Sequence, residues 1–298
     1  MPARARRFLL PFKVQVVADD SGSKGQGTLL VFGGLMAEAK MWARFSTKWA
    51  HCLQQSPAIG NFKLHEAATK SGEFGRMTEA QTKAKLLSLA DIVLGYPLIS
   101  LVIAINLADQ QADWDSGGPM PFAAYKRTKA IKNASYAAAS AAHPYWDAWS
   151  IFVISACYQL WDAGIREPFD FIPDDHPSRG PRTAAWYPII KETVPEPMRS
   201  IMPASVYPQD DKTFMPLQAA DMIAGLARMQ LEGDTKFSWL DEHLSGLRKS
   251  RHSVRIDAGT YAEGREELRS SGHSLPPEAR AAFERLVGFP IKKDPGKP

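Results

Sequence analysis

The sequence predicts an α/β protein with a mixed β-sheet, an N-terminal antiparallel hairpin and helices on both faces of the sheet. Residues 14–18 and 28–35 are rich in β-favouring residues and are joined by a loop with Gly25 and Gly27, which favours a hairpin. Residues 98–105 are apolar at both alternations, as expected of a strand that is covered on both faces. Apolar residues at three- and four-residue steps follow these runs and indicate amphipathic helices.

The first helix is expected at residues 37–53, where large apolar residues recur at the spacing of one helix face. Residues 60–66 break this period and predict a short strand or an extended loop. Thr78 and Gln81 form a capping-box pattern, which satisfies free N–H groups at the start of a second helix. Pro97 ends that helix, because proline lacks the N–H group that a helix interior needs.

Later segments continue the alternation of strands and helices. Residues 169–176 are a short apolar segment that ends in acids. Pro144 begins a helix at a position where the missing N–H is not needed, and residues 183–193 are expected to be helical with a kink at Pro188. Residues 216–227 predict a helix whose Ala and Gly residues let its backbone approach closely whatever lies beneath it.

The expected organisation is a main α/β domain over residues 1–232 and a C-terminal extension over residues 233–298 with helices and a frayed tail. After Gly233 the apolar period weakens into a basic stretch, and a last helix is expected near residues 277–287. The sequence shows no internal repeat and no low-complexity tract that would suggest a different division.

The composition is that of a soluble globular protein, with 298 residues of which 45% are hydrophobic and 23% charged. A formal charge of +4 permits an anionic partner but does not demand one. Cys52 and Cys157 are the two cysteines, and they lie far apart and outside any CxxC spacing, so neither a disulfide framework nor a zinc cluster is expected and a reducing cytoplasm is the default. No secretory signal and no membrane partner are expected, because the longest apolar run, residues 98–107, is too short.

Carboxylates stand at the edges of apolar elements in three places. These are Asp19 with Asp20, Asp174 with Asp175, and Asp221 with Gln218 three residues before it. Asp19 and Asp20 can share one site only if the strand ends between them, since successive side chains of a strand point to opposite faces. Because ligands of α/β sheets gather beyond the carboxyl ends of strands, the three places are expected to meet.

Such a meeting predicts a divalent metal site. Several carboxylates within a few ångströms cannot all ionise without a compensating cation. Oxygen ligands suit Mg²⁺ or Mn²⁺ rather than zinc, and two such ions about 4 Å apart can hold a phosphodiester for attack by water. Taken singly, each acid is explained more simply as a cap, a turn or a surface residue, and residues 19–25 also fit a polar hairpin turn.

Four segments resemble those of a known family. They are residues 19–22, 62–65, 171–176 and 217–225, which include Asp-Asp-Ser-Gly, Phe-Lys-Leu-His and a Gln-x-x-Asp helix. Their order resembles that of the domain of unknown function 3800 family, a widespread prokaryotic family with an Asp-Glu-Ser-Gly start and a Gln-x-x-Asp helix near its end. The resemblance covers roughly residues 13–228.

The resemblance implies a ribonuclease H-like fold, in which a hairpin carries the first acid, crossover helices follow, and a late helix carries the last acid. It makes Asp19 the central metal ligand, Asp174 or Asp175 the mid-chain ligand, and Asp221 the closing ligand. It also makes Gln218 a neighbour that orients water or phosphate.

Further candidates flank these acids. Asp20 stands where the family has Glu, and it is kept as a metal ligand although its side chain is shorter by about one C–C bond. His65 is either a proton shuttle near pH 7 or a structural hydrogen-bonding group, and His176 is open to the same two interpretations. The expected metal ligands are Asp19, Asp20, Asp175 and Asp221, and the expected catalytic set is Asp19, Asp174, Asp175, Asp221, Gln218 and His65.

The expected function is hydrolysis of a nucleic-acid phosphodiester that depends on Mg²⁺ or Mn²⁺. The alternatives are a non-catalytic nucleic-acid-binding or regulatory module on the same fold, and hydrolysis of a small phosphorylated metabolite. Basic residues near 4–7, 126–132 and 248–255 either contact phosphates or form solvated surface. The sequence leaves open the choice between DNA and RNA, the mode of cleavage and the oligomeric state.

Overall fold

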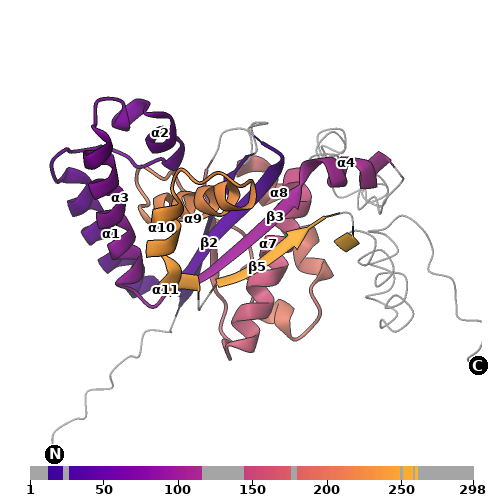
Figure 1. The fold of residues 1–298 in the computed structure, drawn as a ribbon. Helices are drawn as coiled ribbons and strands as arrows, with labels where there is room; N and C mark the ends of the chain where they lie inside the picture. Colours follow the sequence, from indigo (N-terminus) through magenta and orange to yellow (C-terminus); the bar gives the residue numbers. More distant parts are fainter. Residues whose placement is uncertain are drawn as a thin grey trace, which may run out of the picture.

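One open, mixed β-sheet organises the structure, a computed structural model that describes residues 13–22, 27–115, 144–175, 180–248, 251–257 and 259–260 (Figure 1). Within these ranges, five strands follow the order β4-β1-β2-β3-β5 across the sheet. The strands are β1 (Val14–Ser21), β2 (Leu29–Glu38), β3 (Ile99–Asn106), β4 (Asp170–Pro173) and β5 (Arg251–Ile256). His176 and the basic residues at 4–7 and 126–132 lie outside the described residues.

The first three strands form an antiparallel meander, since β1 pairs with β2 and β2 pairs with β3 in opposite directions. The two edge strands are parallel to their neighbours, β4 to β1 and β5 to β3. The predicted α/β class, the mixed sheet and the N-terminal antiparallel hairpin are therefore confirmed. The parallel pair of β1 and β4 brings two carboxyl-terminal strand ends to the same edge of the sheet.

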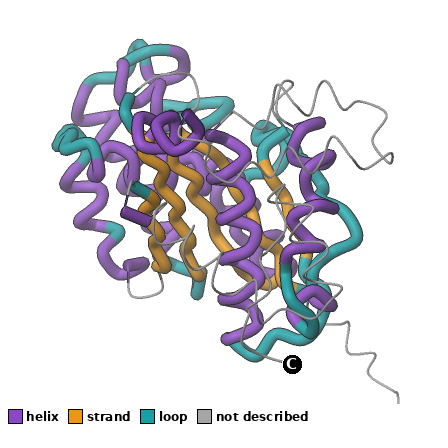
Figure 2. Tube along the Cα trace, turned by 90° about the vertical axis from the view of Figure 1, so that its right-hand side faces the viewer, coloured by secondary structure: helices purple, strands orange, loops and turns teal. Residues whose placement is uncertain are grey.

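Helices cover both faces of the sheet, and Figure 2 shows them on either side of the strands. The helices are α1 (Ala39–Gln54), α2 (Leu64–Thr69), α3 (Glu79–Leu94), α4 (Leu107–Asp115), α7 (Pro144–Asp162), α8 (Gly180–Thr193), α9 (Pro216–Leu231), α10 (Ser238–His243) and α11 (Ser245–Arg248), with short 3-10 helices η1 (Gly72–Phe74) and η2 (Met198–Ile201). The capping box that was predicted from Thr78 and Gln81 is present at the start of α3.

The sheet separates two hydrophobic cores. Residues of α1, α3, α9 and α10 pack in one core, and residues of α7 and α8 pack in the other. Along β1 the side chains alternate between them, so that Val17 belongs to the first core, while Val16 and Ala18 belong to the second. Asp19 follows Val17 by two residues and therefore lies on the face that α9 covers.

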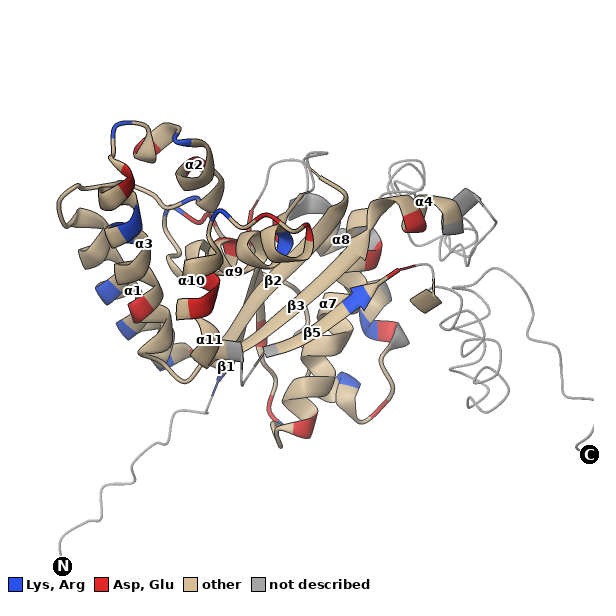
Figure 3. Ribbon diagram, in the orientation of Figure 1, with Lys and Arg blue, Asp and Glu red and all other residues tan. Residues whose placement is uncertain are grey.

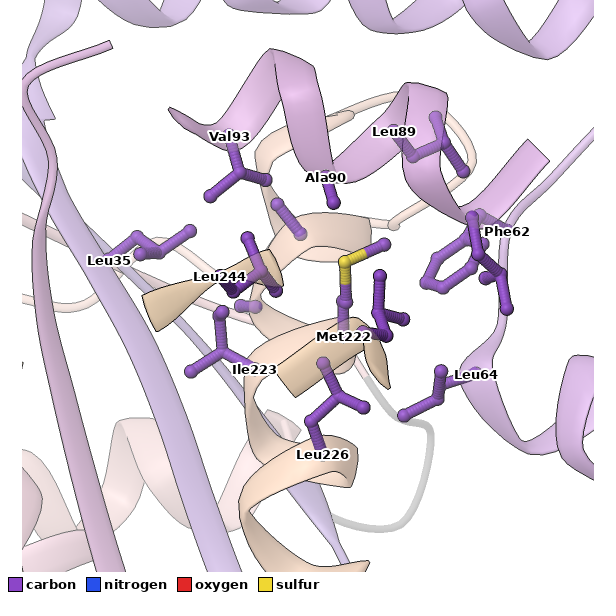
Figure 4. Packing of buried hydrophobic residues seen from close by; sticks show 14 of the residues in the cluster. Leu35, Phe62, Leu64, Leu89, Ala90, Val93, Met222, Ile223, Leu226 and Leu244 are labelled. Atoms are coloured by element: carbon purple, nitrogen blue, oxygen red, sulfur yellow. The ribbon is translucent and has the colours of Figure 1, made fainter. Parts of the chain in front are cut away.

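Helix α9 rests directly on strand β2. A Cβ atom added to Gly33 would lie 2.4 Å from the backbone nitrogen of Ala224, so the two backbones meet where neither has a large side chain. The close approach that the Ala and Gly content predicted is confirmed. Figure 4 shows Met222 and Leu226 of α9 in the same cluster as Leu64 and Leu35. This packing fixes how far α9, which carries Asp221, stands from the sheet.

Two segments differ from the expected local structure. Residues 60–63 form a loop and no strand, and helix α2 begins at Leu64. The Asp221 carboxylate accepts the Leu64 N–H at 2.7 Å, which satisfies an amide at the start of that helix. Strand β1 does not end between Asp19 and Asp20 but continues to Ser21, so that the two side chains start toward opposite faces.

Part of the expected C-terminal extension, residues 233–298, supplies a strand to the sheet, while the helix expected near residues 277–287 lies outside the described residues. Strand β5 pairs with β3 in parallel, and Ile256 is buried in the second core with Val254 packed against it. Arg255 between them is exposed. A short edge strand with charged residues gives a weak apolar pattern, which explains why the sequence did not predict it.

None of the helices in the described part of the chain is long and apolar enough to cross a membrane. Cys52 and Cys157 are both buried and free. These two thiols belong to the hydrophobic cores on opposite faces of the sheet.

Candidate carboxylate site

Asp19 and Asp174 lie side by side at the carboxyl ends of the parallel strands β1 and β4. The register pairs Ala18 with Pro173, so the two acids come at the next position, and the Asp174 N–H donates to the Ala18 carbonyl at 3.0 Å. Figure 3 shows the central strands β2 and β3 almost entirely without charged residues. The carboxylates of this face therefore stand at the strand ends and on the helices above the sheet.

Helix α9 adds Asp221 and Gln218, which hold the backbone of one loop. Gln218 Oε1 accepts the Phe62 N–H at 3.2 Å, and Asp221 Oδ2 accepts the Leu64 N–H at 2.7 Å. Because these two side chains are three residues apart on one helix face, they can accept hydrogen bonds from two amides of the same loop, those of Phe62 and Leu64. The residue between those amides is Lys63, whose backbone position is thus set by the Gln-x-x-Asp pair.

The Lys63 ammonium lies among the carboxylates. Its Nζ atom is 2.7 Å from Asp211 Oδ2 and 3.5 Å from Asp19 Oδ2. Asn61 Nδ2 also lies 3.5 Å from Asp211 Oδ2, and Asp211 is buried. Asp19 Oδ1 accepts the N–H of Asp20 at 2.7 Å. The site thus joins the ends of β1 and β4, helix α9, the loop before α2 and the loop before α9.

Burial and mutual repulsion make ionisation of the cluster costly. Burial raises the pKa of Asp19 well above its usual range; the Lys63 charge opposes this rise, while the charges of Asp174 and Asp221 add to it. Burial also raises the pKa of Asp174 to about 6 and raises that of Asp221, in both cases against the opposing charge of Lys63. Three carboxylates from distant parts of the chain therefore act on one another through space.

The pKa of Lys63 responds in the opposite sense. Burial alone lowers it, but the charges of Asp19 and Asp221 and the hydrogen bond with Asp211 raise it above its usual value. The ammonium therefore stays protonated at all physiological pH values. The one positive charge of Lys63 does not compensate the negative charges of the cluster, because the pKa values of Asp19, Asp174 and Asp221 remain raised in its presence.

The carboxylates of the site fit a magnesium or manganese ion only if most of the ligands of that ion are water and substrate oxygens. Among the described residues, no three His, Cys, Asp or Glu side chains are grouped closely enough to hold a metal ion together. Magnesium, however, is usually held by one or two carboxylates, several waters and the phosphates of a substrate. The oxygen-only donors and the shortage of positive charge fit that form, whereas a closed cage of protein ligands is not present in the described residues.

The remaining residues of the predicted site lie at its margin. Asp20 is half-buried at the end of β1, and its negative charge contributes to the raised pKa values of Asp19, Asp174 and Asp221. Asp175 is exposed beyond Asp174, and its N–H donates to the Gln209 carbonyl at 2.8 Å. His65 is exposed on α2, and no hydrogen bond or ion pair of its ring to another described residue is found.

Gln218 does not have the role that the resemblance implied. The residue is fully buried, and its amide is bonded to protein groups on both sides. Its oxygen accepts from Trp49 Nε1 at 2.8 Å and from the Phe62 N–H, and its nitrogen donates to the Asp211 carbonyl at 2.8 Å. Gln218 therefore positions the two loops that carry Lys63 and Asp211, and it does not reach water or phosphate itself.

Sequence reasoning missed Lys63, Asp211 and Asn61. Lys63 lies within the segment 62–65 that carried the resemblance, yet a lone lysine gives no signal of its own. Asp211 follows Asp210 just before Pro216, and such a pair of acids ahead of a helix fits a turn equally well. The ion pairs of Lys63 with Asp19 and Asp211, and the contact of Asn61 with Asp211, show that these residues belong with Asp19.

The metal-free protein is expected to lose stability as the pH rises from about 4 to 7. The native Asp174 has a pKa of about 6, while an unfolded Asp titrates near its usual value of about 3.9. Between these values the native state binds more protons than the unfolded state, so the free energy of unfolding falls with rising pH. Thermal unfolding in the presence of a chelator measures this effect.

An Asp174→Asn variant provides the control, because it removes the titrating group and keeps the shape of the side chain. Its unfolding temperature is expected to depend less on pH over the same window. A wild-type unfolding temperature that changes between pH 5 and 7 no more than that of the variant would contradict the raised pKa.

The segments that carried the resemblance meet at this site. Two of the four, residues 62–65 and 217–225, are hydrogen-bonded to each other through Gln218 and Asp221. Membership of the domain of unknown function 3800 family stays a prediction from those segments. No family model matches the chain, and no curated protein matches it in sequence.

Proposed function

We propose that the protein is a phosphodiesterase that cleaves nucleic acid with the help of Mg²⁺ or Mn²⁺, on a ribonuclease H-like domain. The observation that carries the proposal is the convergence of Asp19, Asp174 and Asp221 from three distant parts of the chain. Their raised pKa values mean that bringing them together costs free energy. A fold that keeps such a costly cluster at a strand edge is typical of a functional site.

The topology also favours this proposal. A hairpin carries Asp19, helices come next, and the late helix α9 carries Asp221, which is the layout that a ribonuclease H-like fold implies. Asp19 and Asp174 share the edge where parallel strands end, and ligands of α/β sheets gather at such edges. These features support the fold assignment, and the residues at that edge support the chemistry.

The cation would be held by Asp19 together with Asp174 or Asp221, with water and a substrate phosphate as the remaining ligands. When bound, it would lower the pKa of a water nucleophile and stabilise the leaving oxygen. The residues of the chain have separate tasks. Gln218 fixes the loops around the site, Asp221 fixes the start of α2 through the Leu64 amide, and Asp175 stands exposed beside the cluster.

The second candidate is a nucleic-acid-binding module without catalysis. The observation that favours it is the Lys63 ammonium, which already supplies a positive charge to Asp19 and Asp211. A module of this kind has no need of a divalent ion at the carboxylates. Its binding to nucleic acid would weaken steeply with rising salt, because lysine and arginine contacts to phosphate release counterions.

The test uses the full chain with end-labelled DNA and RNA, each single- and double-stranded, and with a nucleotide as a competing small substrate. Each is incubated with Mg²⁺, with Mn²⁺ or with a chelator. Cleavage that needs the divalent ion is the expected result. Salt-dependent binding without any cleavage would overturn the enzyme in favour of the second candidate, and inhibition of polymer cleavage by low nucleotide concentrations would indicate a small phosphorylated substrate instead.

An Asp170→Asn variant is the matched control for the assay. Asp170 lies at the opposite end of β4 from Asp174, where it pairs with Lys13 at 2.8 Å. The substitution removes one carboxylate from the same strand and leaves the site intact. Its cleavage rate is expected to equal that of the wild type.

A further inference from the structure

The position of Lys63 suggests how the cluster is neutralised before a metal ion arrives. Its ammonium makes a close ion pair with Asp211, at 2.7 Å, and a looser one with Asp19, at 3.5 Å. The Lys63 side chain is 31% exposed, whereas those of Asp19 and Asp211 are 5% and 8% exposed. Lys63 is thus the most exposed of the three partners, and its ammonium pairs with two buried carboxylates.

The contacts also allow the ammonium to move while the backbone stays in place. The amides on both sides of Lys63 are held by Gln218 and Asp221, so the loop is anchored. The lysine side chain is a flexible four-carbon stem with a compact charge. A shift of the ammonium away from Asp19 would keep the ion pair with Asp211, which has the shorter distance.

The charge balance makes such a shift favourable when a divalent ion binds. Lys63 is the positive charge that acts on Asp19, Asp174 and Asp221 alike, and these carboxylates repel one another. A divalent ion at Asp19 would supply two positive charges and would repel the ammonium at short range. The ammonium and the ion therefore compete for the same carboxylate.

We propose that Lys63 is the exchangeable counter-cation of this site: it neutralises Asp19 in the metal-free chain and yields that carboxylate to a divalent ion, while it stays bound to Asp211. This inference rests on the proposed metal-dependent function. It adds that the site is ordered before the metal binds, and that the metal must displace a charge of the chain itself.

The test compares Mn²⁺ affinity in the wild type and in Lys63→Met, measured by titration calorimetry and by the electron paramagnetic resonance of free Mn²⁺. The variant is expected to bind Mn²⁺ at least about tenfold more tightly, because the competing charge is gone. Its unfolding temperature without metal is expected to be lower than that of the wild type, and to recover when Mn²⁺ is added. Lys63→Arg keeps the charge and is expected to retain weak, wild-type-like affinity.

Lys40→Met is the matched control, since it removes the same charge from a side chain that is 68% exposed and pairs with Glu38. Its Mn²⁺ affinity is expected to match that of the wild type. Equal or weaker affinity in Lys63→Met, with measurable binding in the wild type, would overturn this inference and leave the proposed function standing. Absence of Mn²⁺ binding in both proteins would overturn the metal-dependent function as well.

Discussion

Asp19→Asn is expected to lower the rate of metal-dependent phosphodiester cleavage by about 10³-fold. Asp19 is buried near the carboxyl end of β1, and its carboxylate pairs with the Lys63 ammonium. It is therefore the carboxylate that we expect to bind the divalent ion. Stabilisation by a metal ion is worth several kcal/mol, and each 1.4 kcal/mol is about a factor of ten in rate. Cleavage of labelled substrate at saturating Mg²⁺ measures the loss.

The same variant should keep its fold, which separates loss of function from unfolding. The raised pKa of Asp19 means that its ionised form opposes folding at neutral pH, and the neutral amide removes that cost. The unfolding temperature of metal-free Asp19→Asn is therefore expected to be no lower than that of the wild type. A folded Asp19→Asn protein that cleaves the substrate at the wild-type rate would exclude Asp19 from the chemistry.

Gly33→Ala is expected to lower the free energy of unfolding by about 2–3 kcal/mol, as overpacking of a tight core contact does. The added Cβ would lie 2.4 Å from the backbone nitrogen and 2.7 Å from the Cα of Ala224, so helix α9 has to move away from β2. Since α9 also carries Gln218 and Asp221, we expect the affinity for Mn²⁺ to fall together with the stability. Urea unfolding and the Mn²⁺ titration measure the two effects.

Gly246→Ala is the matched control for this substitution. A Cβ at Gly246 would meet only a Leu94 methyl group at 3.4 Å, which is an ordinary contact. Its stability is expected to remain within about 0.5 kcal/mol of the wild type. A Gly33→Ala protein as stable as Gly246→Ala would show that the backbones of α9 and β2 are not in close contact at Gly33.

The parts of the fold that local pattern controls could be predicted from the sequence. The hairpin follows from two β-favouring runs and a short loop, β3 from continuous apolar character, and α3 from its capping box. Each depends on residues that lie near one another in the chain. Strand β5 and helix α2 could not be predicted in this way, because β5 depends on pairing with β3 and the start of α2 depends on a hydrogen bond that the Leu64 N–H donates to Asp221.

Some residues of the candidate site could likewise be predicted from the sequence, and others could not. The unusual position of Asp19 at a strand end and of Asp221 on a helix of small residues could be recognised in the sequence, because acids at the edges of apolar elements are costly. The roles of Lys63, Asp211 and Gln218 could not be recognised. Each of these residues acts through partners that are far away along the chain, such as Asp19 for Lys63 and Phe62 for Gln218.

The sequence by itself determined the α/β class, the hairpin and the acids that stand at the ends of its elements, since periodicity and propensity act over a few residues. Only the tertiary structure decided that an ammonium lies among those acids and that Gln218 holds loops in place. The physical reason is that charge interactions and hydrogen bonds act at a few ångströms in space. Which groups come within that range depends on how closely α9 packs on the sheet.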